Sequence, residues 1–142
     1  MLYQITYMSD AVGEVTDDVL ENILEASRRN NTKEEVTGLL LHQDGHYIQV
    51  IEGELEAVVT CFERICQDPR HQNLRTLLRS DIRERLFKNW AMGTLSKDSS
   101  FADLQTQLEP ILKELTQETS SLAFKRTLVF KVLRLFRSVD ST

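Results

Sequence analysis

Residues 30–53 read NNTKEEVTGLLLHQDGHYIQVIEG, and this stretch decides the fold that the sequence predicts. Val36–Leu41 and Tyr47–Ile51 are apolar runs rich in branched side chains. The Asp44-Gly45 pair between them supplies the positive backbone angles that a tight hairpin turn needs. The stretch therefore predicts two antiparallel strands joined by that turn.

Gln49 is the polar exception in the second strand of this hairpin, because it lies between Ile48 and Val50. A buried primary amide that is left unpaired costs on the order of 1 to 3 kcal/mol, so it needs hydrogen-bond partners at both of its ends. We therefore expect a polar group to face Gln49 inside the core.

Regular patterns on either side of the hairpin predict the other elements of the body. Leu2–Met8 alternates as a strand does, and Thr16 is a candidate N-cap of a helix that fades at Arg28–Asn31. A second helical pattern follows the hairpin and ends at Asp68-Pro69, because proline restricts the residue before it. A fourth strand, a charged connection and a short fifth strand are then expected at Leu74–Leu78, Asp81–Lys88 and Trp90–Leu95.

This order of elements predicts an α+β, ferredoxin-like βαββαββ sandwich, in which two helices cover one face of a five-stranded mixed sheet. The first and third strands are neighbours at the centre of such a sheet, so Tyr7 is expected beside Gln49. The third strand is apolar on both faces, and the second face of the sheet therefore needs a cover too. We assign residues 1–95 to this body and residues 96–142 to a C-terminal helical extension that covers the second face.

Two apolar patterns predict helices in the extension. The first is one helix, or two helices broken near Pro110, with the apolar residues Phe101, Leu104, Leu108, Ile111, Leu112 and Leu115. The second is a final helix with the apolar stripe Leu128, Val129, Val132, Leu133 and Phe136. We expect this stripe to pack on its own sheet or across a symmetric interface between copies.

The final helix is also basic. Between Ser121 and Arg137 the chain has no acidic residue and five basic ones, Lys125, Arg126, Lys131, Arg134 and Arg137. A solvated helix face is the commonest explanation of such a run, and an interaction surface is the alternative. Basic residues beside an apolar stripe can also bind an anionic membrane, which we do not expect here.

Composition limits the possible function classes. The 142 residues, of which 41% are hydrophobic, can bury one domain core, and a net charge of -5 argues against a nucleic-acid-binding surface. No basic leader opens the sequence and no apolar run approaches the roughly 20 residues of a membrane span, so we expect a cytoplasmic protein. The spacing of Cys61 and Cys66 fits neither a redox pair nor a zinc knuckle. We therefore expect two reduced thiols and no metal site.

Six sequence blocks together resemble the signature of the BLUF family, the sensors of blue light using flavin. They are Tyr7-Met8-Ser9, Ser27-Arg28-Arg29-Asn30-Asn31, Val36-Thr37-Gly38-Leu39-Leu40, Gln49-Val50-Ile51-Glu52-Gly53, Asp68-Pro69-Arg70-His71 and Trp90-Ala91-Met92. The resemblance implies a flavin, FAD or FMN, held without a covalent bond on the sheet between the two helices. The tail after Ser96 is similar to the two-helix extension of the short, single-domain members.

A flavin ring needs aliphatic walls and a few polar groups at its rim. The candidate walls are Ile23, Leu24, Leu40 and Ile65. Asn30 and Asn31, at the end of the first helix, can both give and accept hydrogen bonds at the rim, and the resemblance gives this role to Asn31.

Four further residues are candidates for the polar parts of the cofactor. Arg64 and Asp68 are four residues apart and are expected on one face of the second helix, where they could hold the far carbonyl of the ring or the ribityl hydroxyls. Arg70 and His71 lie beyond that helix and could bind phosphate. Simpler explanations exist for all of these residues: the two asparagines could cap a helix, Arg64 and Asp68 could form a surface ion pair, and His71 could face solvent.

The resemblance implies a photoreceptor that turns over no substrate. Tyr7, Gln49 and the flavin C4 carbonyl would form one hydrogen-bond chain, in which light drives an electron and a proton from Tyr7 and rearranges Gln49. Trp90 and Met92 would report the new state to the tail, and the sequence leaves open which of them lies beside Gln49 in the dark. The expected partners are further copies, in a homodimer or a higher homo-oligomer, and a downstream signalling protein.

Two other function classes remain open from the residues alone. One is an enzyme on a ferredoxin-like scaffold that binds a flavin or another small molecule, and the other is a flavin-free interaction module. The sequence has no Gly-rich phosphate loop and no ordered Cys-His or Ser-His pairing that would favour an enzyme. The colour of the purified protein and its response to blue light distinguish the three classes.

Overall fold

The computed structural model describes residues 1–88, 90–94 and 102–137 of the chain. The strands are β1 (Leu2–Ala11), β2 (Thr37–Gln43), β3 (His46–Glu54) and β4 (His71–Ile82). The helices are α1 (Asp17–Glu34), α2 (Leu55–Cys66), α3 (Ala102–Leu115) and α4 (Leu122–Arg137).

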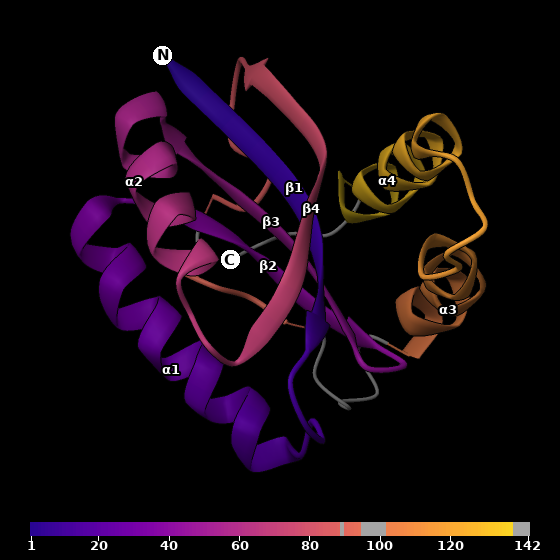
Figure 1. Cartoon of the computed structure of the whole chain (residues 1–142). Coiled ribbons are helices and arrows are strands. Elements are labelled where there is room, and N and C mark those ends of the chain that lie inside the picture. The colour runs from indigo at the N-terminus through magenta and orange to yellow at the C-terminus, as the bar shows by residue number, and fades with distance from the viewer. Residues whose placement is uncertain (89, 95–101, 138–142) are drawn as a thin grey trace.

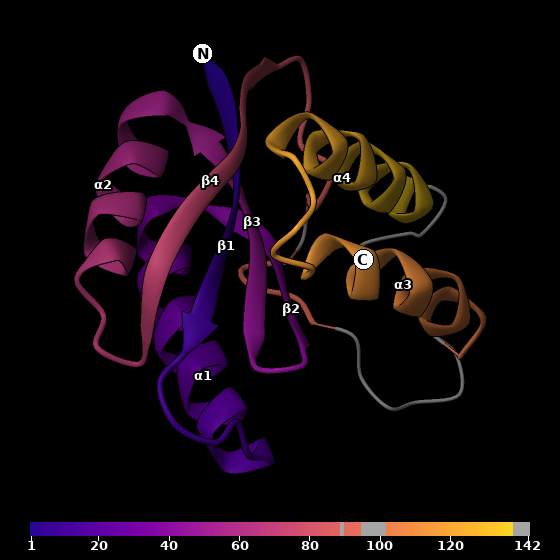
Figure 2. The ribbon, with the colours of Figure 1, turned by 45° about the vertical axis from the view of Figure 1, so that its right-hand side comes forward.

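The described chain forms three layers. The sheet has the order β2-β3-β1-β4, and every neighbouring pair of strands is antiparallel. Helices α1 and α2 cover one face, and α3 and α4 cover the other (Figures 1 and 2). The α+β class is confirmed, and so is the cover that the tail supplies to the second face of the sheet.

The sheet has four antiparallel strands in the described part of the chain, so the prediction of a five-stranded mixed sheet is wrong. Gly93 makes only an isolated parallel bridge to Leu39, although Trp90 and Gly93 exchange backbone hydrogen bonds with Gly38. A Cβ built on Gly38 would lie 2.0 Å from the Val50 carbonyl oxygen, and one on Gly93 would lie 2.1 Å from the Trp90 ring. The segment meets β2 through backbone hydrogen bonds at Gly38 and Leu40 and adds no fifth strand to the described sheet. Leu95, the expected end of the fifth strand, lies outside the described residues.

The hairpin has the predicted geometry. Asp44 and Gly45 both have positive φ angles, 50° and 80°, which is the pattern of a two-residue turn that matches the twist of antiparallel strands. In the register between β1 and β3, Tyr7 lies opposite Gln49. The predicted lateral pair is therefore confirmed.

The helix boundaries are close to the predicted ones, except at the end of α1. Thr16 caps α1 by accepting a hydrogen bond from the Val19 amide at 3.2 Å, as expected. The helix does not fade at Arg28–Asn31 but continues to Glu34, and Glu35 then takes the left-handed conformation. Helix α3 runs through Pro110 as one helix, which is the first of the two predicted arrangements, and leucines before and after this residue are buried; Phe101 lies outside the described residues.

Strand β4 is longer than predicted, because Leu74–Leu78 is only its middle part. It begins at His71, which was expected in a loop, and the charged connection correspondingly begins after Ile82 rather than at Asp81. We call residues 83–88 and 90–94, which follow β4, the connecting segment. Side chains of this segment reach both faces of the sheet, and those on the face under α1 and α2 contribute to the site.

Two apolar cores lie on the two faces of the sheet. The core under α1 and α2 contains Ile5, Leu24, Val36, Leu40, Tyr47, Ile51, Val58, Cys61 and Met92. The core under α3 and α4 includes Met8, Leu39, Leu41, Ile48, Val50, Leu77 and Phe87, together with Leu104, Leu108, Leu112 and Leu115 of α3 and the stripe Leu128, Val129, Val132, Leu133 and Phe136 of α4. The stripe packs on its own sheet, which is the first of the two predicted arrangements.

Two further predictions concern membrane spans and the two cysteines. No helix in the described ranges is long and apolar enough to cross a membrane. Cys61 and Cys66 are both free thiols, as predicted. Cys61 is buried, and this burial raises the pKa of its thiol to about 11.

Candidate functional site

A cleft of about 570 Å³ opens between α1 and α2 above the centre of the sheet. Its lining combines apolar groups with many polar ones: Ala26, Ser27, Asn30, Asn31, Gln49, Cys61, Arg64, Ile65, Gln67, Asp68, Pro69 and Arg70. A smaller cavity of about 40 Å³ shares several of these residues and is also lined by Tyr7, Ile23, Leu40, Tyr47 and His71. The two hollows together bring side chains from both helices, the sheet and the loop after α2 to one place.

Gln49 is the centre of a buried hydrogen-bond chain at the floor of this cleft. The Tyr7 hydroxyl donates to Gln49 Oε1, and Gln49 Nε2 donates to Met92 Sδ at 3.3 Å. Tyr7, Gln49 and Met92 are each less than 5% exposed. The polar partner that the sequence requires for Gln49 is therefore present, and the amide is paired at both ends.

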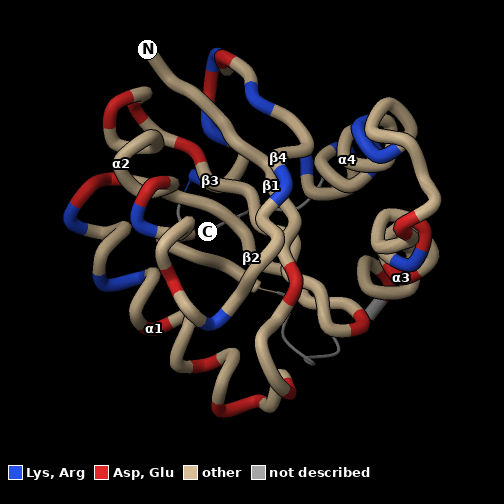
Figure 3. Tube along the Cα trace, viewed as in Figure 1, with Lys and Arg blue, Asp and Glu red and all other residues tan. Residues whose placement is uncertain are grey.

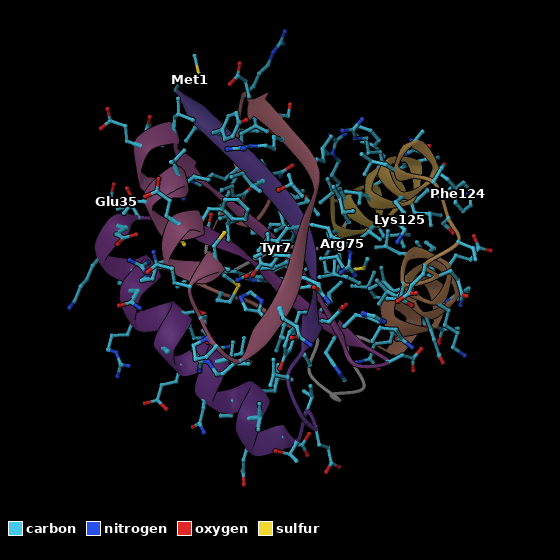
Figure 4. The ribbon with its side chains drawn as sticks, in the orientation of Figure 1. Met1, Tyr7, Glu35, Arg75, Phe124 and Lys125 are labelled. Atoms are coloured by element: carbon cyan, nitrogen blue, oxygen red, sulfur yellow. The ribbon has the colours of Figure 1, made fainter. Side chains whose placement is uncertain are left out.

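Tyr7 is held in its protonated form. Burial is the largest cause, and it raises the pKa of the phenol well above its ordinary value. The ring lies in the middle of the molecule (Figure 4) and contacts Phe62 at 5.7 Å and His71 at 6.1 Å between ring centroids. A protonated phenol carries the hydrogen that its bond to Gln49 Oε1 requires.

Met92, and not Trp90, lies beside Gln49. Trp90 packs on the opposite side of the sheet, where its ring stacks on Phe87 at 5.6 Å and meets Phe136 of α4 at 6.3 Å. The question that the sequence leaves open is answered by the path of the connecting segment. Met92 faces the cleft, and Trp90 faces α4 on the other side of the sheet.

Asn31 and Arg28 hold the connecting segment from α1. Asn31 Nδ2 donates to the Ala91 carbonyl at 2.7 Å, and Arg28 Nε donates to the Met92 carbonyl at 2.9 Å. Asn31 is 2% exposed, and its Oδ1 lies 3.6 Å from Cys61 Sγ. Asn30 is half-buried at the rim of the cleft. The two asparagines line one cleft but have different surroundings.

Arg64 and Asp68 do not share a helix face, so the expected arrangement is wrong. Helix α2 ends at Cys66, and Asp68 lies in the loop beyond it. Arg64 forms a two-bond ion pair with Glu34 of α1, at 2.8 and 3.2 Å. Asp68 instead pairs with Arg70, whose Nη2 lies 2.6 Å from Asp68 Oδ2, and this bond lowers the pKa of the Asp68 carboxyl. Both arginines still line the cleft, and Arg70 also lines the smaller cavity.

His71 does not face solvent from a loop. It is the first residue of β4, and its Nε2 lies 2.7 Å from the Ile65 carbonyl oxygen, to which it must donate. Nδ1 then accepts a hydrogen bond from the Ser9 hydroxyl at 2.7 Å. Because both ring nitrogens have partners within the protein, His71 supports the cavity wall beside Tyr7 rather than offering a free donor to a phosphate.

Three of the four candidate wall residues line the cleft or the smaller cavity beside it, namely Ile23, Leu40 and Ile65. Leu24 is only 2% exposed and belongs to the core under α1 and α2. Its helical position turns it towards the sheet. Leu24 therefore supports the cleft without lining it.

The sequence reading missed three polar residues around the site. Arg28 contacts the Met92 carbonyl, and Ser9 contacts His71. Glu52 is fully buried three residues after Gln49. The argument that singles out Gln49 applies equally to Glu52, because a carboxyl group in an apolar strand also needs partners. No local pattern indicates the contacts of Arg28 and Ser9, which join residues far apart in the chain.

Comparison with known proteins agrees with this site. The family profile described as "BLUF: Sensors of blue-light using FAD" matches residues 2–93. The chain belongs to the BLUF family. Among solved structures, the dark state of the BLUF protein BlrB is 29% identical, with a TM-score of 0.74 and 96% of each chain covered. The BLUF domain is thus a flavin-based blue-light sensor.

Two further similar proteins are much longer than this chain. The photoactivated adenylate cyclase subunit beta of Euglena gracilis is 32% identical over 118 residues, which are 81% of this chain and 14% of the relative. The structure of Klebsiella pneumoniae BlrP1 with FMN and cyclic diGMP is 27% identical with a TM-score of 0.67, and covers 98% of this chain and 35% of that chain. The chain spans a small part of the length of these proteins.

The cleft fits the flavin, FAD or FMN, that BLUF domains bind without a covalent bond. Its volume of about 570 Å³ is in the range of cofactor sites, and the buried amide of Gln49 is at its floor. Ile65 and Ala26 provide apolar surface, and Asn30, Arg64 and Arg70 provide polar groups at the rim. This lining matches a ring with apolar faces and a polar edge.

Proposed function

We propose that this BLUF chain senses blue light through Tyr7, Gln49 and Met92, which act as one hydrogen-bond switch. The observation that carries the proposal is the buried chain from the Tyr7 hydroxyl through the Gln49 amide to the Met92 sulfur at the floor of the cleft. When bound, the flavin supplies absorption of blue light and an excited state that accepts an electron. The residues of the chain supply the rest.

Tyr7 is the proposed donor of the electron and the proton. A phenol is oxidised more readily than the aliphatic side chains around it, and its proton can move along the existing bond to Gln49 Oε1. The raised pKa of Tyr7 keeps that proton in place in the dark. Recombination returns the electron and the proton to Tyr7, so no substrate is consumed.

Gln49 is the proposed switch. Its amide presents an oxygen to Tyr7 and a nitrogen to Met92, and rotation or tautomerisation exchanges donor and acceptor character between these ends. The nitrogen has a second N–H, which a flavin carbonyl in the cleft could accept. A rearranged amide changes this bond and shifts the flavin absorption slightly to the red.

Several residues are proposed to hold the cofactor. Asn30, Asn31 and Arg64 line the larger hollow, and Asp68 and Arg70 lie where it meets the smaller one. Arg64 and Arg70 each have a carboxylate partner, Glu34 and Asp68, which fixes their direction. We propose that they reach the ribityl or phosphate part of the flavin from these positions.

The experiment compares absorption spectra in the dark and under blue light for the wild type and two variants. The wild type should be yellow and show a reversible red shift. Gln49→Leu should keep flavin and lose the shift, because leucine fills the space without hydrogen bonds. Tyr7→Phe should lose the shift too, because it keeps the ring but lacks the O–H. A colourless wild type, or a normal shift in Gln49→Leu, would overturn the proposal.

The signal is proposed to leave through binding to another protein or to a second copy of the chain. The basic side chains of α4 support this route. Arg134 and Arg137 border an open groove whose other charged lining residues are Arg83, Arg85 and Lys88 with Asp81 and Glu84, so basic groups predominate. An acidic partner surface would complement this groove. We also propose a cytoplasmic location, which agrees with two free thiols in a chain of this size.

A further inference from the structure

Glu52 has an arrangement that the switch does not account for. It lies on β3 three residues after Gln49, but alternation turns it to the opposite face of the sheet, and its side chain is 0% exposed. A carboxylate with no access to water is costly unless several donors meet it. The groups that donate hydrogen bonds to Glu52 therefore indicate its role.

Four donors converge on this carboxylate. Two are backbone amides of the connecting segment: Leu86 N donates to Oε2 at 3.1 Å, and Phe87 N donates to Oε1 at 2.5 Å. The other two are side chains from the neighbouring strands, Gln4 Nε2 at 3.1 Å and Thr37 Oγ1 at 3.4 Å. The two backbone amides and Gln4 donate to these oxygens, and the Thr37 hydroxyl can do so. Burial raises the pKa of the Glu52 carboxyl, while the bonds from Phe87, Leu86 and Gln4 oppose this rise and favour a carboxylate, which accepts at both oxygens as an amide does not.

The segment that Glu52 binds joins the cleft to the tail. Phe87 stacks on Trp90 at 5.6 Å and meets Phe136 of α4 at 5.7 Å. Further along the same segment, Met92 accepts the hydrogen bond from Gln49. One end of the segment is therefore tied to the sheet and the tail, and the other end touches the switch.

We infer that Glu52 is a positioning residue that fixes the connecting segment at Leu86 and Phe87, so that a change at Gln49 moves Met92 and Trp90 about this fixed point and reaches α4 through Phe136. Without the fixed point, a movement of Met92 would be absorbed by the loop after β4 and would not reach the tail. Arg85 reinforces the point, because its Nη1 contacts Thr37 Oγ1 at 3.1 Å and the Glu52 carbonyl at 3.3 Å. This inference rests on the proposed switch at Gln49.

The test uses Glu52→Gln in the full chain. The variant keeps the size of the side chain but directs an NH₂ group at donors. Trp90 is the only tryptophan of the chain, so its fluorescence reports on the ring cluster with Phe87 and Phe136. We expect the flavin red shift to remain, because the cleft is on the other face, and most of the light-minus-dark change in Trp90 fluorescence to be lost.

Glu54→Gln is the matched control. Glu54 is on the same strand, its side chain is 62% exposed, and it pairs with the N-terminal amine. This control should behave as the wild type in both readouts. A full Trp90 response in Glu52→Gln would overturn the inference, whereas loss of the red shift in the wild type itself would instead overturn the proposed function.

Amide hydrogen exchange in the wild type provides a second measurement, which decides the matter even if Glu52→Gln fails to fold. A fixed point requires the Leu86 and Phe87 amides to stay protected in the dark and in the light, while exchange at Trp90 and Gly93 changes with light. Loss of protection at Leu86 and Phe87 under light would overturn the inference. Leu86 N and Phe87 N bond to different oxygens of Glu52, so in a folded Glu52→Gln one of the two amides faces the new NH₂ group and should exchange roughly tenfold faster or more, because it loses its acceptor.

Discussion

Each buried polar side chain of this protein needs hydrogen-bond partners, and these conditions are the strictest on single residues in the chain. Gln49 and Asn31 meet them through side chains and carbonyls that lie far away in the sequence. Glu52 meets them with four donors from three segments. Thr6 does not meet them: its hydroxyl is buried and has no hydrogen-bond partner within the described part of the chain.

Replacing Thr6 by Val should stabilise the protein. Thr6 is 1% exposed, among Leu39, Val50 and Val129 at a cavity of about 10 Å³ between the sheet and α4. An unpaired buried hydroxyl costs on the order of 1 kcal/mol, and valine keeps the shape while removing it. Urea unfolding of Thr6→Val and of Thr6→Ser measures the effect. The serine variant keeps the hydroxyl and loses a methyl group, so it should be less stable than the wild type. A Thr6→Val variant that loses stability would mean that the hydroxyl has a partner, such as a buried water.

Asn31→Ala should weaken flavin retention more than Asn30→Ala. Both residues line the cleft, but only Asn31 also holds the Ala91 carbonyl. The loss of one good hydrogen bond in a buried site corresponds to about 1 to 2 kcal/mol of binding, or about a tenfold weaker affinity. Flavin occupancy after purification and a titration of the apoprotein measure it. If the wild type and Asn31→Ala retain equal amounts of flavin, Asn31 only holds the connecting segment in place and makes no contribution to flavin binding.

At the scale of elements, the ends of three strands are joined by one carboxylate. Asp10 on β1 contacts His46 on β3 at 2.8 Å and Arg75 on β4 at 3.0 Å, and Asn73 donates to its other oxygen at 3.0 Å. Burial raises the pKa of Asp10, but hydrogen bonds from Arg75, Asn73 and His46 outweigh this effect and bring the pKa to about 2. The network joins the end of β1 to the beginnings of β3 and β4.

This network predicts a pH dependence of stability. The folded pKa of about 2 is below the usual value near 3.9 of an unfolded aspartate, so its contribution is complete above about pH 4 and is lost as the pH falls towards 2. After allowance for solvent screening, the contribution is about 1 kcal/mol. Unfolding free energies of the wild type and Asp10→Asn should therefore differ at pH 7 and converge at the acid end. The exposed Asp81, changed to Asn, is the control and should follow the wild type. A constant difference between the wild type and Asp10→Asn at all pH values would assign the effect to packing.

At the scale of the whole molecule, charge is distributed unevenly. The first half of α1 is acidic and its second half carries both signs, whereas the charged residues of α4 are all basic (Figure 3). The basic run of α4 is not simply a solvated face, because Lys125 is only 8% exposed and Arg126 donates to the Leu77 carbonyl at 3.0 Å. Burial lowers the pKa of Lys125, and the nearby Arg75 lowers it further (Figure 4). Part of this run serves the fold, and the remainder is available to a partner.

Removing the tail tests how far the sheet depends on it. A chain cut after Ser99 would expose the face formed by Met8, Leu39, Leu41, Ile48 and Val50, now covered by α3 and α4. We expect a core that binds flavin and keeps most of the red shift, because the cleft is on the other face, but that aggregates or changes its oligomeric state. Light scattering after gel filtration and light-minus-dark spectra measure both properties. A truncated protein that stays monodisperse at the stoichiometry of the full chain would show that the cover is dispensable. The boundary at residue 95 itself stays a prediction.

The sequence by itself determined the features that depend on neighbours along the chain. The hairpin follows from the Asp44-Gly45 turn, and the central position of Gln49 follows from strand alternation and the order of elements. The stripe of α4 follows from helical period, and its burial follows from the apolar second face of β3. Each of these depends on periodicity, turn chemistry or the cost of exposed apolar surface, all of which can be read from adjacent residues.

Only the tertiary structure decided which side chains meet. Met92 lies beside Gln49 and Trp90 does not, because the connecting segment bends at Ala91 and Met92 where backbone hydrogen bonds hold it against β2, so that two side chains two residues apart face opposite sides of the sheet. Arg64 pairs with Glu34 rather than Asp68, because α2 ends before Asp68 and the last turns of α1 and α2 bring Arg64 and Glu34 within reach of each other. A polar side chain has several possible partners of similar energy, and the backbone path of distant segments selects among them.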